Sequence, residues 1–176
     1  MKRTKTSTLN GRDLQQLPFD LMITYRPTGY IKFDGMEKEV RFITNGIEYD
    51  YLYYSWERDR QTNKYHTHIL LKTTQDTEQM NQGIYKRLQG DKNTNNIRRG
   101  VRDGVVKMEK VFVNSLTQEK EVLVIDQKVE IQFTEMYGRS GRVYIEPVIG
   151  NTSVSYYTTK STSRGLTMGY IQGDEK

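Results

Sequence analysis

The sequence predicts an α+β fold with an antiparallel sheet and few helices. Short segments rich in β-branched and aromatic residues alternate apolar with polar positions, which is typical of half-buried strands. Only two segments, 34–46 and 73–89, are predicted as helices. A length of 176 residues favours a single domain, because two domains would each have too small an interior. We therefore expect one domain over residues 1–176, with residues 1–17 as a basic N-terminal arm.

The first half of the chain predicts three strands and one short helix. In PFDLMITYRP apolar residues alternate with polar ones until Pro27 and Gly29 end the strand. The helix at 34–46 follows. The segments YDYLYYSWE (49–57) and YHTHILLK (65–72) are predicted as two strands that pair as a hairpin across the turn RDRQTNK.

The second half predicts one helix, one loop and several short strands. The helix at 73–89 has apolar residues at helical spacing, and Gly90 fits the position after its end. Residues 91–103 are polar, basic and contain glycine, which indicates a loop. VVKMEKVFV, EVLVI and VEIQF are predicted as separate strands. GRVYIEPVI is a last strand that lies at an edge or ends at Pro147.

Basic residues are concentrated in a few segments of this chain, whose formal net charge is +5. Between Lys86 and Lys110 there are eight basic and three acidic residues, and residues 147–173 contain no carboxylate. Such segments indicate a polyanionic partner, most commonly nucleic acid. The alternative is a basic surface that is only solvated. The DNA-binding candidates in the basic segment are Arg98, Arg99 and Arg102.

Composition excludes several classes of protein. No apolar run approaches the roughly 18 residues that a membrane-spanning helix needs, so we expect no membrane partner. The basic start MKRTKTSTLN has no apolar stretch after it, so we do not expect it to be a secretory signal. Because the chain has no cysteine, disulfides, thiolate metal sites and cysteine nucleophiles are excluded. We expect a soluble intracellular protein in which any metal is held by His, Asp or Glu.

The chain has two histidines, His66 and His68, both in the predicted strand YHTHILLK. Residues two apart in a strand point to the same face, so the imidazoles would lie side by side, as a metal site requires. Glu57 is on the other strand of the hairpin, where pairing would bring it opposite the histidines. Two imidazoles and a carboxylate suit Mg²⁺ or Mn²⁺, with Zn²⁺ as an alternative. The other interpretation is three strand residues that hold no ligand.

A candidate nucleophile lies in the segment YTTK near the end of the chain. In a helix Tyr157 and Lys160 would stand one turn apart on the same face. A neighbouring ammonium stabilises the phenolate of a tyrosine, whose pKa is ordinarily about 10, and also attracts a phosphate. Tyr156, four residues before Lys160, is the alternative nucleophile. An isolated pair of this kind is also common without any function.

Together these motifs resemble those of the HUH endonucleases, specifically the rolling-circle replication initiators of small single-stranded DNA viruses, phages and plasmids. LMITY followed by RP resembles the first motif, HTH with Glu57 upstream resembles the metal motif, and YTTK resembles the nucleophile motif. The motifs stand in the family's order and span about residues 19–165. This chain has Thr67 where the family usually has a bulky apolar residue, and it lacks the phosphate-binding motif of a helicase domain.

The resemblance implies a sheet of about five antiparallel strands with flanking helices, similar to an RNA-recognition or ferredoxin-like module. It implies that Glu57, His66 and His68 hold Mg²⁺ or Mn²⁺ at the scissile phosphate. Tyr157, assisted by Lys160, would form a 5′-phosphotyrosine link and release a 3′-OH that primes replication. The substrate would be a single-stranded DNA origin, with or without a hairpin, and unwinding and synthesis would need a separate helicase and polymerase. The protein would act in the host cytoplasm for a phage or plasmid, and in the nucleus for a eukaryotic virus.

Three alternatives stay open. A relaxase or transposase would use the same chemistry on a different DNA. A non-catalytic module that binds single-stranded nucleic acid would need neither Tyr157 nor a metal. A metal-dependent phosphohydrolase would form no covalent adduct with DNA.

Overall fold

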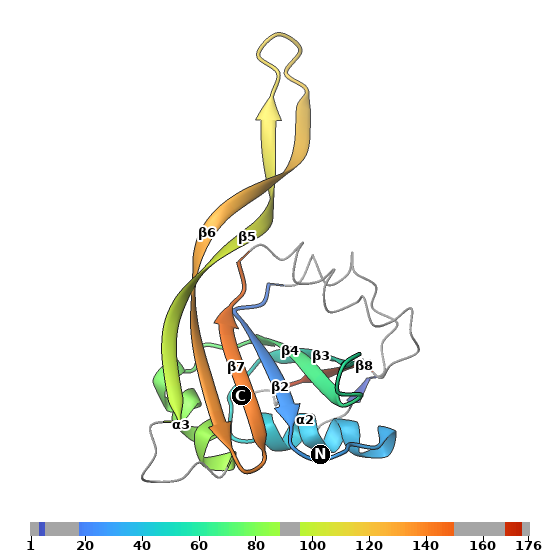
Figure 1. Ribbon diagram of the computed structural model, residues 1–176. Helices are drawn as coiled ribbons and strands as arrows, with labels where there is room; N and C mark the ends of the chain where they lie inside the picture. The colour runs from blue at the N-terminus through green and yellow to red at the C-terminus, as the bar shows by residue number, and fades with distance from the viewer. Residues whose placement is uncertain (1–3, 6–17, 89–95, 150–167, 174–176) are drawn as a thin grey trace.

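The computed structural model describes residues 4–5, 18–88, 96–149 and 168–173, which form one antiparallel sheet and two α-helices (Figure 1). The strands are β1 (Thr4–Lys5), β2 (Leu21–Pro27), β3 (Tyr51–Arg58), β4 (Tyr65–Lys72), β5 (Ile97–Val113), β6 (Lys120–Gly138), β7 (Gly141–Pro147) and β8 (Met168–Gln172). The helical segments are η1 (Phe33–Gly35), α2 (Met36–Thr44) and α3 (Thr77–Arg87). The order in the sheet is β1-β8-β3-β4-β2-β7-β6-β5. The α+β class and the antiparallel sheet are confirmed, and the described sheet has eight strands where about five were expected.

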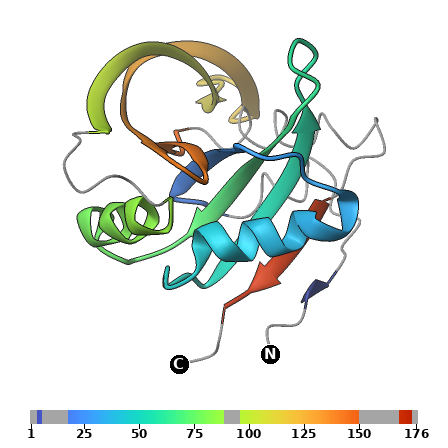
Figure 2. The same cartoon turned by 60° about the horizontal axis from the view of Figure 1, so that its bottom comes forward.

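Both helices pack against the same face of the sheet (Figure 2). The alternation of side chains along the strands turns Ile23, Leu52 and Ile69 toward this face. There they meet Val40 of α2 and Ile84 of α3, and all five side chains are fully buried. Each buried side chain of this size stabilises the fold by about 1.5–3 kcal/mol. The even-numbered residues of β2 and β4 consequently point to the opposite face, on which the described residues place no helix.

Several expected elements are confirmed by the structure. The predicted strand 65–72 coincides with β4, and β3 and β4 form the expected hairpin. The helix expected at 34–46 is present as η1 and α2. The helix expected at 73–89 begins only at Thr77, because the Asp76 carboxylate accepts a hydrogen bond from the Gln79 N–H and caps it there. Gly90 lies outside the described residues.

The prediction of a basic loop at 91–103 is wrong for the second part of that segment. Residues 91–95 lie outside the described residues, but β5 begins at Ile97 and runs through Gly100 of this segment and through Gly104 just after it. A Cβ atom at Gly100 would lie 2.6 Å from the ring of Phe133, and one at Gly104 would lie 2.6 Å from Ile131. The glycines therefore make room for large side chains of the neighbouring strand instead of interrupting β5.

The strands EVLVI and VEIQF, expected as separate elements, both belong to β6, which pairs with β5 from Lys120 to Met136. The two strands form a long twisted ribbon that projects from the sheet (Figure 1). β7 is not an edge strand, since it pairs with β2 and β6, but it ends at Pro147 as expected. Of the expected arm 1–17, residues 4–5 form β1, and the other residues lie outside the described part. No sequence pattern indicated β1 or β8.

Candidate metal centre

Glu57, His66 and His68 lie together on the face of the sheet that the helices leave uncovered. Glu57 pairs directly with His66 across the β3–β4 hairpin, and His68 follows on the same face of β4. Oε2 of Glu57 lies 3.6 Å from Nε2 of His66 and 3.7 Å from Nε2 of His68. One ligand atom from each residue lies within 4.8 Å of the others. The structure thus brings together the three metal-ligand candidates that the sequence indicates, and we call them the triad.

The distances in the triad fit a shared cation better than direct hydrogen bonds. A hydrogen bond from nitrogen to oxygen is about 2.9 Å long, which is clearly shorter than the two Glu57–histidine distances. Two ligand atoms that are each about 2.1 Å from one ion lie about 3.0 Å apart at a right angle and about 3.6 Å apart at 120°. The triad can therefore bind one divalent ion through two nitrogens and one oxygen with only small movements of its side chains.

Both histidines of the triad are buried, and burial keeps His66 in the neutral form that binds a metal. His66 is 5% exposed and His68 is 4% exposed, whereas Glu57 is partly exposed. Burial, with a further contribution from the neighbouring His68, lowers the pKa of His66 from 6.5 to about 4. His66 is therefore neutral at pH 7, and one of its ring nitrogens keeps a lone pair that a metal can accept. Among the described residues His66 Nδ1 is buried and has no hydrogen-bond partner.

Thr24 of β2 is a functional candidate that sequence reasoning missed. Its backbone pairs with His68, and its Oγ1 lies 3.1 Å from Nδ1 of that histidine. With the proton on Nδ1, this hydrogen bond holds the ring in place and leaves the lone pair on Nε2, next to Glu57. The alternation in LMITYRP does turn Thr24 away from the core, but the sequence does not show that β2 pairs with the histidine strand.

A cavity of about 530 Å³ lies beside the triad on the same face of the sheet. Its walls come from β2, β4 and β7 and from the base of the β5–β6 ribbon. Residues that line it include Thr24, Arg26, His68, Arg102, Arg142 and Tyr144. The cavity thus combines guanidinium groups with an aromatic ring, which are the groups that bind the phosphates and bases of a nucleic acid strand.

The three arginines selected as DNA-binding candidates do not lie on one face. Arg98 and Arg102 point to the face of the triad, where Arg98 lies over an aromatic ring of β6 and Arg102 pairs with Glu146 at 2.8 Å. Arg99 lies on the opposite face and pairs with Glu78 of α3 at 2.6 Å. Because successive side chains of β5 point to opposite faces of the sheet, Arg99 is separated from Arg98 and Arg102. A loop, as expected here, would not impose this separation.

An aromatic pair extends the uncovered face from the cavity toward the ribbon. The rings of Phe133 and Tyr144 stack with their centroids 5.2 Å apart and an interplanar angle of 19°. The Tyr144 hydroxyl accepts a hydrogen bond from Nε of Arg102, and the Arg98 guanidinium lies 5.8 Å from the centre of the Phe133 ring. Two cations and two stacked rings thus lie in succession next to the cavity.

The nucleophile candidates Tyr157 and Tyr156, and Lys160 with them, lie outside the described residues. The described chain resumes at Met168, whose backbone pairs with Ser55 of β3. Ser55 is in turn the partner of His68 across the hairpin.

No family model, curated protein or solved structure matches this chain. In the part of the chain that the structure describes, no helix is both long enough and apolar enough to cross a membrane.

Proposed function

We propose that this protein is a metal-dependent endonuclease that nicks and rejoins single-stranded DNA through a tyrosine, and that it initiates rolling-circle replication at an origin. The observation that carries the proposal is the triad on the uncovered face of the sheet, next to a cavity lined by arginines and an aromatic ring. A carboxylate and two imidazoles leave coordination positions open for phosphate oxygens.

The arrangement of the central strands supports an HUH fold of the RNA-recognition or ferredoxin-like kind. The strands β3, β4, β2 and β7 are consecutive neighbours and antiparallel, with both helices on one face and the triad on the other. The segment LMITY, which resembles the first family motif, lies in β2 beside the strand of the paired histidines.

Arginines fixed by carboxylates would guide the DNA strand across this face. Each of the three arginines at the cavity pairs with a nearby carboxylate, which holds the guanidinium group in a defined position. The pairs are Arg26–Asp59, Arg102–Glu146 and Arg142–Glu135. Partly neutralised arginines beside stacked rings favour a single strand with exposed bases over a duplex, which offers only phosphates and groove edges.

The triad residues and the tyrosine would divide the chemistry between them. Glu57, His66 and His68 would hold Mg²⁺ or Mn²⁺, which when bound polarises the scissile phosphate. The Tyr157 hydroxyl would lose its proton to solvent and form a bond to phosphorus while the bond from phosphorus to the 3′-oxygen breaks. The released oxygen takes up a proton as the 3′-OH, and its attack in the reverse direction rejoins the strand. Lys160 would stabilise the charge that develops.

Formation of a covalent adduct tests the proposal. The protein is incubated with a pool of single-stranded oligonucleotides and Mn²⁺, separated under denaturing conditions, digested, and searched by mass spectrometry for a tyrosine that carries a nucleotide. We expect the adduct on Tyr157 in the wild type and in Tyr156→Phe. Tyr157→Phe should bind DNA with nearly wild-type affinity, because only a hydroxyl is lost, yet form no adduct.

Each other result corresponds to one of the alternatives. An adduct on Tyr156 would keep the enzyme class and move the nucleophile. Cleavage without an adduct would indicate a phosphohydrolase, and binding without cleavage would indicate a non-catalytic module. Nicking of transfer-origin or transposon-end DNA in preference to a replication origin would indicate a relaxase or transposase.

A further inference from the structure

The β5–β6 ribbon extends far beyond the sheet that it belongs to. Among the described residues, β6 pairs with β7 only from Thr134 to Gly138, so residues 120–133 pair with β5 alone. At about 3.3 Å per residue, this unsupported part of β6 is roughly 45 Å long. An isolated two-stranded ribbon is only marginally stable in water, so a ribbon of this length needs a partner surface.

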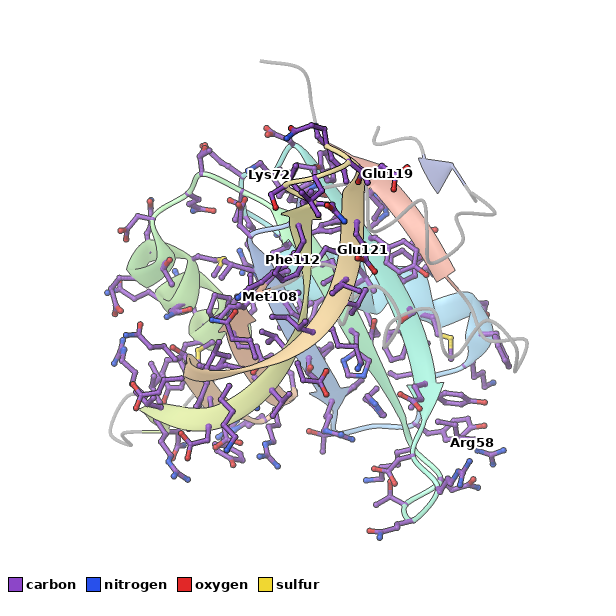
Figure 3. All side chains as sticks on the ribbon, turned by 90° about the horizontal axis from the view of Figure 1, so that it is seen from above. Arg58, Lys72, Met108, Phe112, Glu119 and Glu121 are labelled. Carbon is purple, nitrogen blue, oxygen red and sulfur yellow. The ribbon has the colours of Figure 1, made fainter. Side chains whose placement is uncertain are left out.

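The end of the ribbon exposes apolar side chains on two strands that, among the described residues, pair there only with each other. Phe112 is 48% exposed and Leu123 is 42% exposed on one face of the ribbon, and Val111 is 60% exposed on the opposite face. Figure 3, which looks down on the ribbon, labels Met108 and Phe112 on β5 and Glu121 on β6. Exposed apolar groups that are diagonal neighbours on one face, as Phe112 and Leu123 are, are typical of an interaction surface.

The charges at the end of the ribbon favour a protein partner over a nucleic acid. Residues 107–128 contain four lysines and four carboxylates, so this segment has no net charge in a chain whose net charge is +5. A surface that binds phosphates carries an excess of cations, which this segment lacks. A neutral, apolar surface also does not repel a second copy of itself, although the chain as a whole is positively charged.

One face of the ribbon is self-complementary. We call it the Phe112 face, and its residues are Met108, Lys110 and Phe112 of β5 and Glu121, Leu123 and Ile125 of β6. In the register of the ribbon Lys110 is opposite Leu123 and Phe112 is opposite Glu121, so the two charged residues occupy one diagonal and the two apolar residues the other. Two such faces can be stacked by a two-fold axis that lies between them and runs along the diagonal from Phe112 to Leu123. This rotation exchanges the positions of Lys110 and Glu121, so each Lys110 lies against the partner's Glu121.

We infer that this protein forms a two-fold symmetric dimer in which the Phe112 faces of two ribbons pack across each other at a steep angle. Phe112 then packs on the partner's Phe112 and Leu123 packs on the partner's Leu123 in an apolar centre. Two Lys110–Glu121 ion pairs flank that centre, an arrangement of apolar core and polar rim that is typical of protein interfaces. This inference concerns a surface separate from the triad and does not depend on the proposed nuclease activity.

Sedimentation of the full chain without DNA tests the inference. We expect a mass of twice 20.7 kDa at high concentration and dissociation on dilution. Lys110→Glu places like charges together and should weaken the dimer about tenfold or more, while Lys110→Glu combined with Glu121→Lys restores it. Lys128→Glu, the same charge change on the opposite face of the ribbon, is the matched control and should leave the mass unchanged.

A second measurement keeps the test decisive if a variant folds poorly. Equal amounts of ¹⁴N- and ¹⁵N-labelled wild-type protein are mixed and treated with a carbodiimide, which joins amines to carboxylates in direct contact. A mixed-isotope peptide pair that links Lys110 to Glu121 would support the dimer. A monomer at every concentration, equal effects of Lys110→Glu and Lys128→Glu, or a Lys110–Glu121 link found only within one isotope would overturn it.

Discussion

Oγ1 of Thr24 lies 3.1 Å from Nδ1 of His68, so the second imidazole of the triad is held by a strand outside its own hairpin. The two residues are 44 positions apart in the sequence. The other two members of the triad, Glu57 and His66, are direct partners within the hairpin. The orientation of the metal ligands therefore depends on both the β3–β4 hairpin and the β2–β4 pairing.

Replacing Thr24 by valine should weaken Mn²⁺ binding about 10- to 100-fold, the usual effect of losing a residue that orients a metal-ligating histidine. Valine has the same shape but cannot hydrogen-bond to Nδ1 of His68. Thr24→Ser keeps the hydroxyl and should retain most of the affinity. Calorimetric titration with Mn²⁺ measures both variants. Equal affinities for wild type and Thr24→Val would show that the hydrogen bond does not orient the ligand.

Replacing a ligand of the triad should abolish DNA cleavage. Most of the DNA binding should remain, because basic side chains supply most of the affinity for DNA. His68→Ala and Glu57→Gln test this by adduct formation and fluorescence anisotropy, with EDTA-treated wild type as a third sample. Mn²⁺ at about 100 times its Kd should stabilise the wild type by about 2.7 kcal/mol and these variants by much less. Full cleavage in EDTA would contradict the metal assignment.

Arg98→Ala and Arg99→Ala form a matched pair, since the two residues are neighbours on β5 but point to opposite faces. Arg98→Ala should lower the slope of log affinity against log salt concentration by about 0.7, the value for one phosphate contact on a single strand. Arg99→Ala should leave the slope unchanged, because Arg99 pairs with Glu78 on the helix side. Equal slopes for the two variants would mean that the face of the triad does not bind the strand.

Alkaline pH should destabilise the fold through buried tyrosines. Burial, with a smaller contribution from Glu37, raises the pKa of Tyr54 from 10.0 to about 12. Between pH 10 and pH 12 the unfolded chain loses the tyrosine proton before the folded chain does. The contribution of Tyr54 to the free energy of unfolding is therefore complete below pH 10 and is lost as the pH rises toward 12. At pH 11.5 the loss from this one group is about 2 kcal/mol.

Urea unfolding at pH 9 and pH 11.5 measures this effect. Tyr54→Phe should remove that part of the pH dependence. Tyr30→Phe is the control, because it removes the hydroxyl of a tyrosine that is 71% exposed and leaves Tyr54 in place. An identical fall in the free energy of unfolding for wild type and Tyr54→Phe would exclude this origin of the alkaline sensitivity.

The sequence alone determined the antiparallel strands, the β3–β4 hairpin and the common face of Glu57, His66 and His68. Each of these follows from local rules, because side chains alternate along a strand and a short turn forces the two adjoining segments to pair. The sequence also contains the motif YTTK and resembles the HUH endonucleases, in which such a tyrosine attacks a phosphate. That part stays a prediction, since Tyr157 and Lys160 lie outside the described residues.

Only the tertiary structure decided which strands lie beside the histidines and how far the ribbon extends. The pairing of β2 with both β4 and β7 places Thr24 between His68 and Tyr144, although the three residues are far apart in the chain. In the sequence Gly100 and Gly104 are typical of a loop. In the structure they lie in a strand, where Phe133 and Ile131 occupy the space that their side chains would fill. Contacts between distant segments decide such positions, and the local pattern of apolar and polar residues does not encode them.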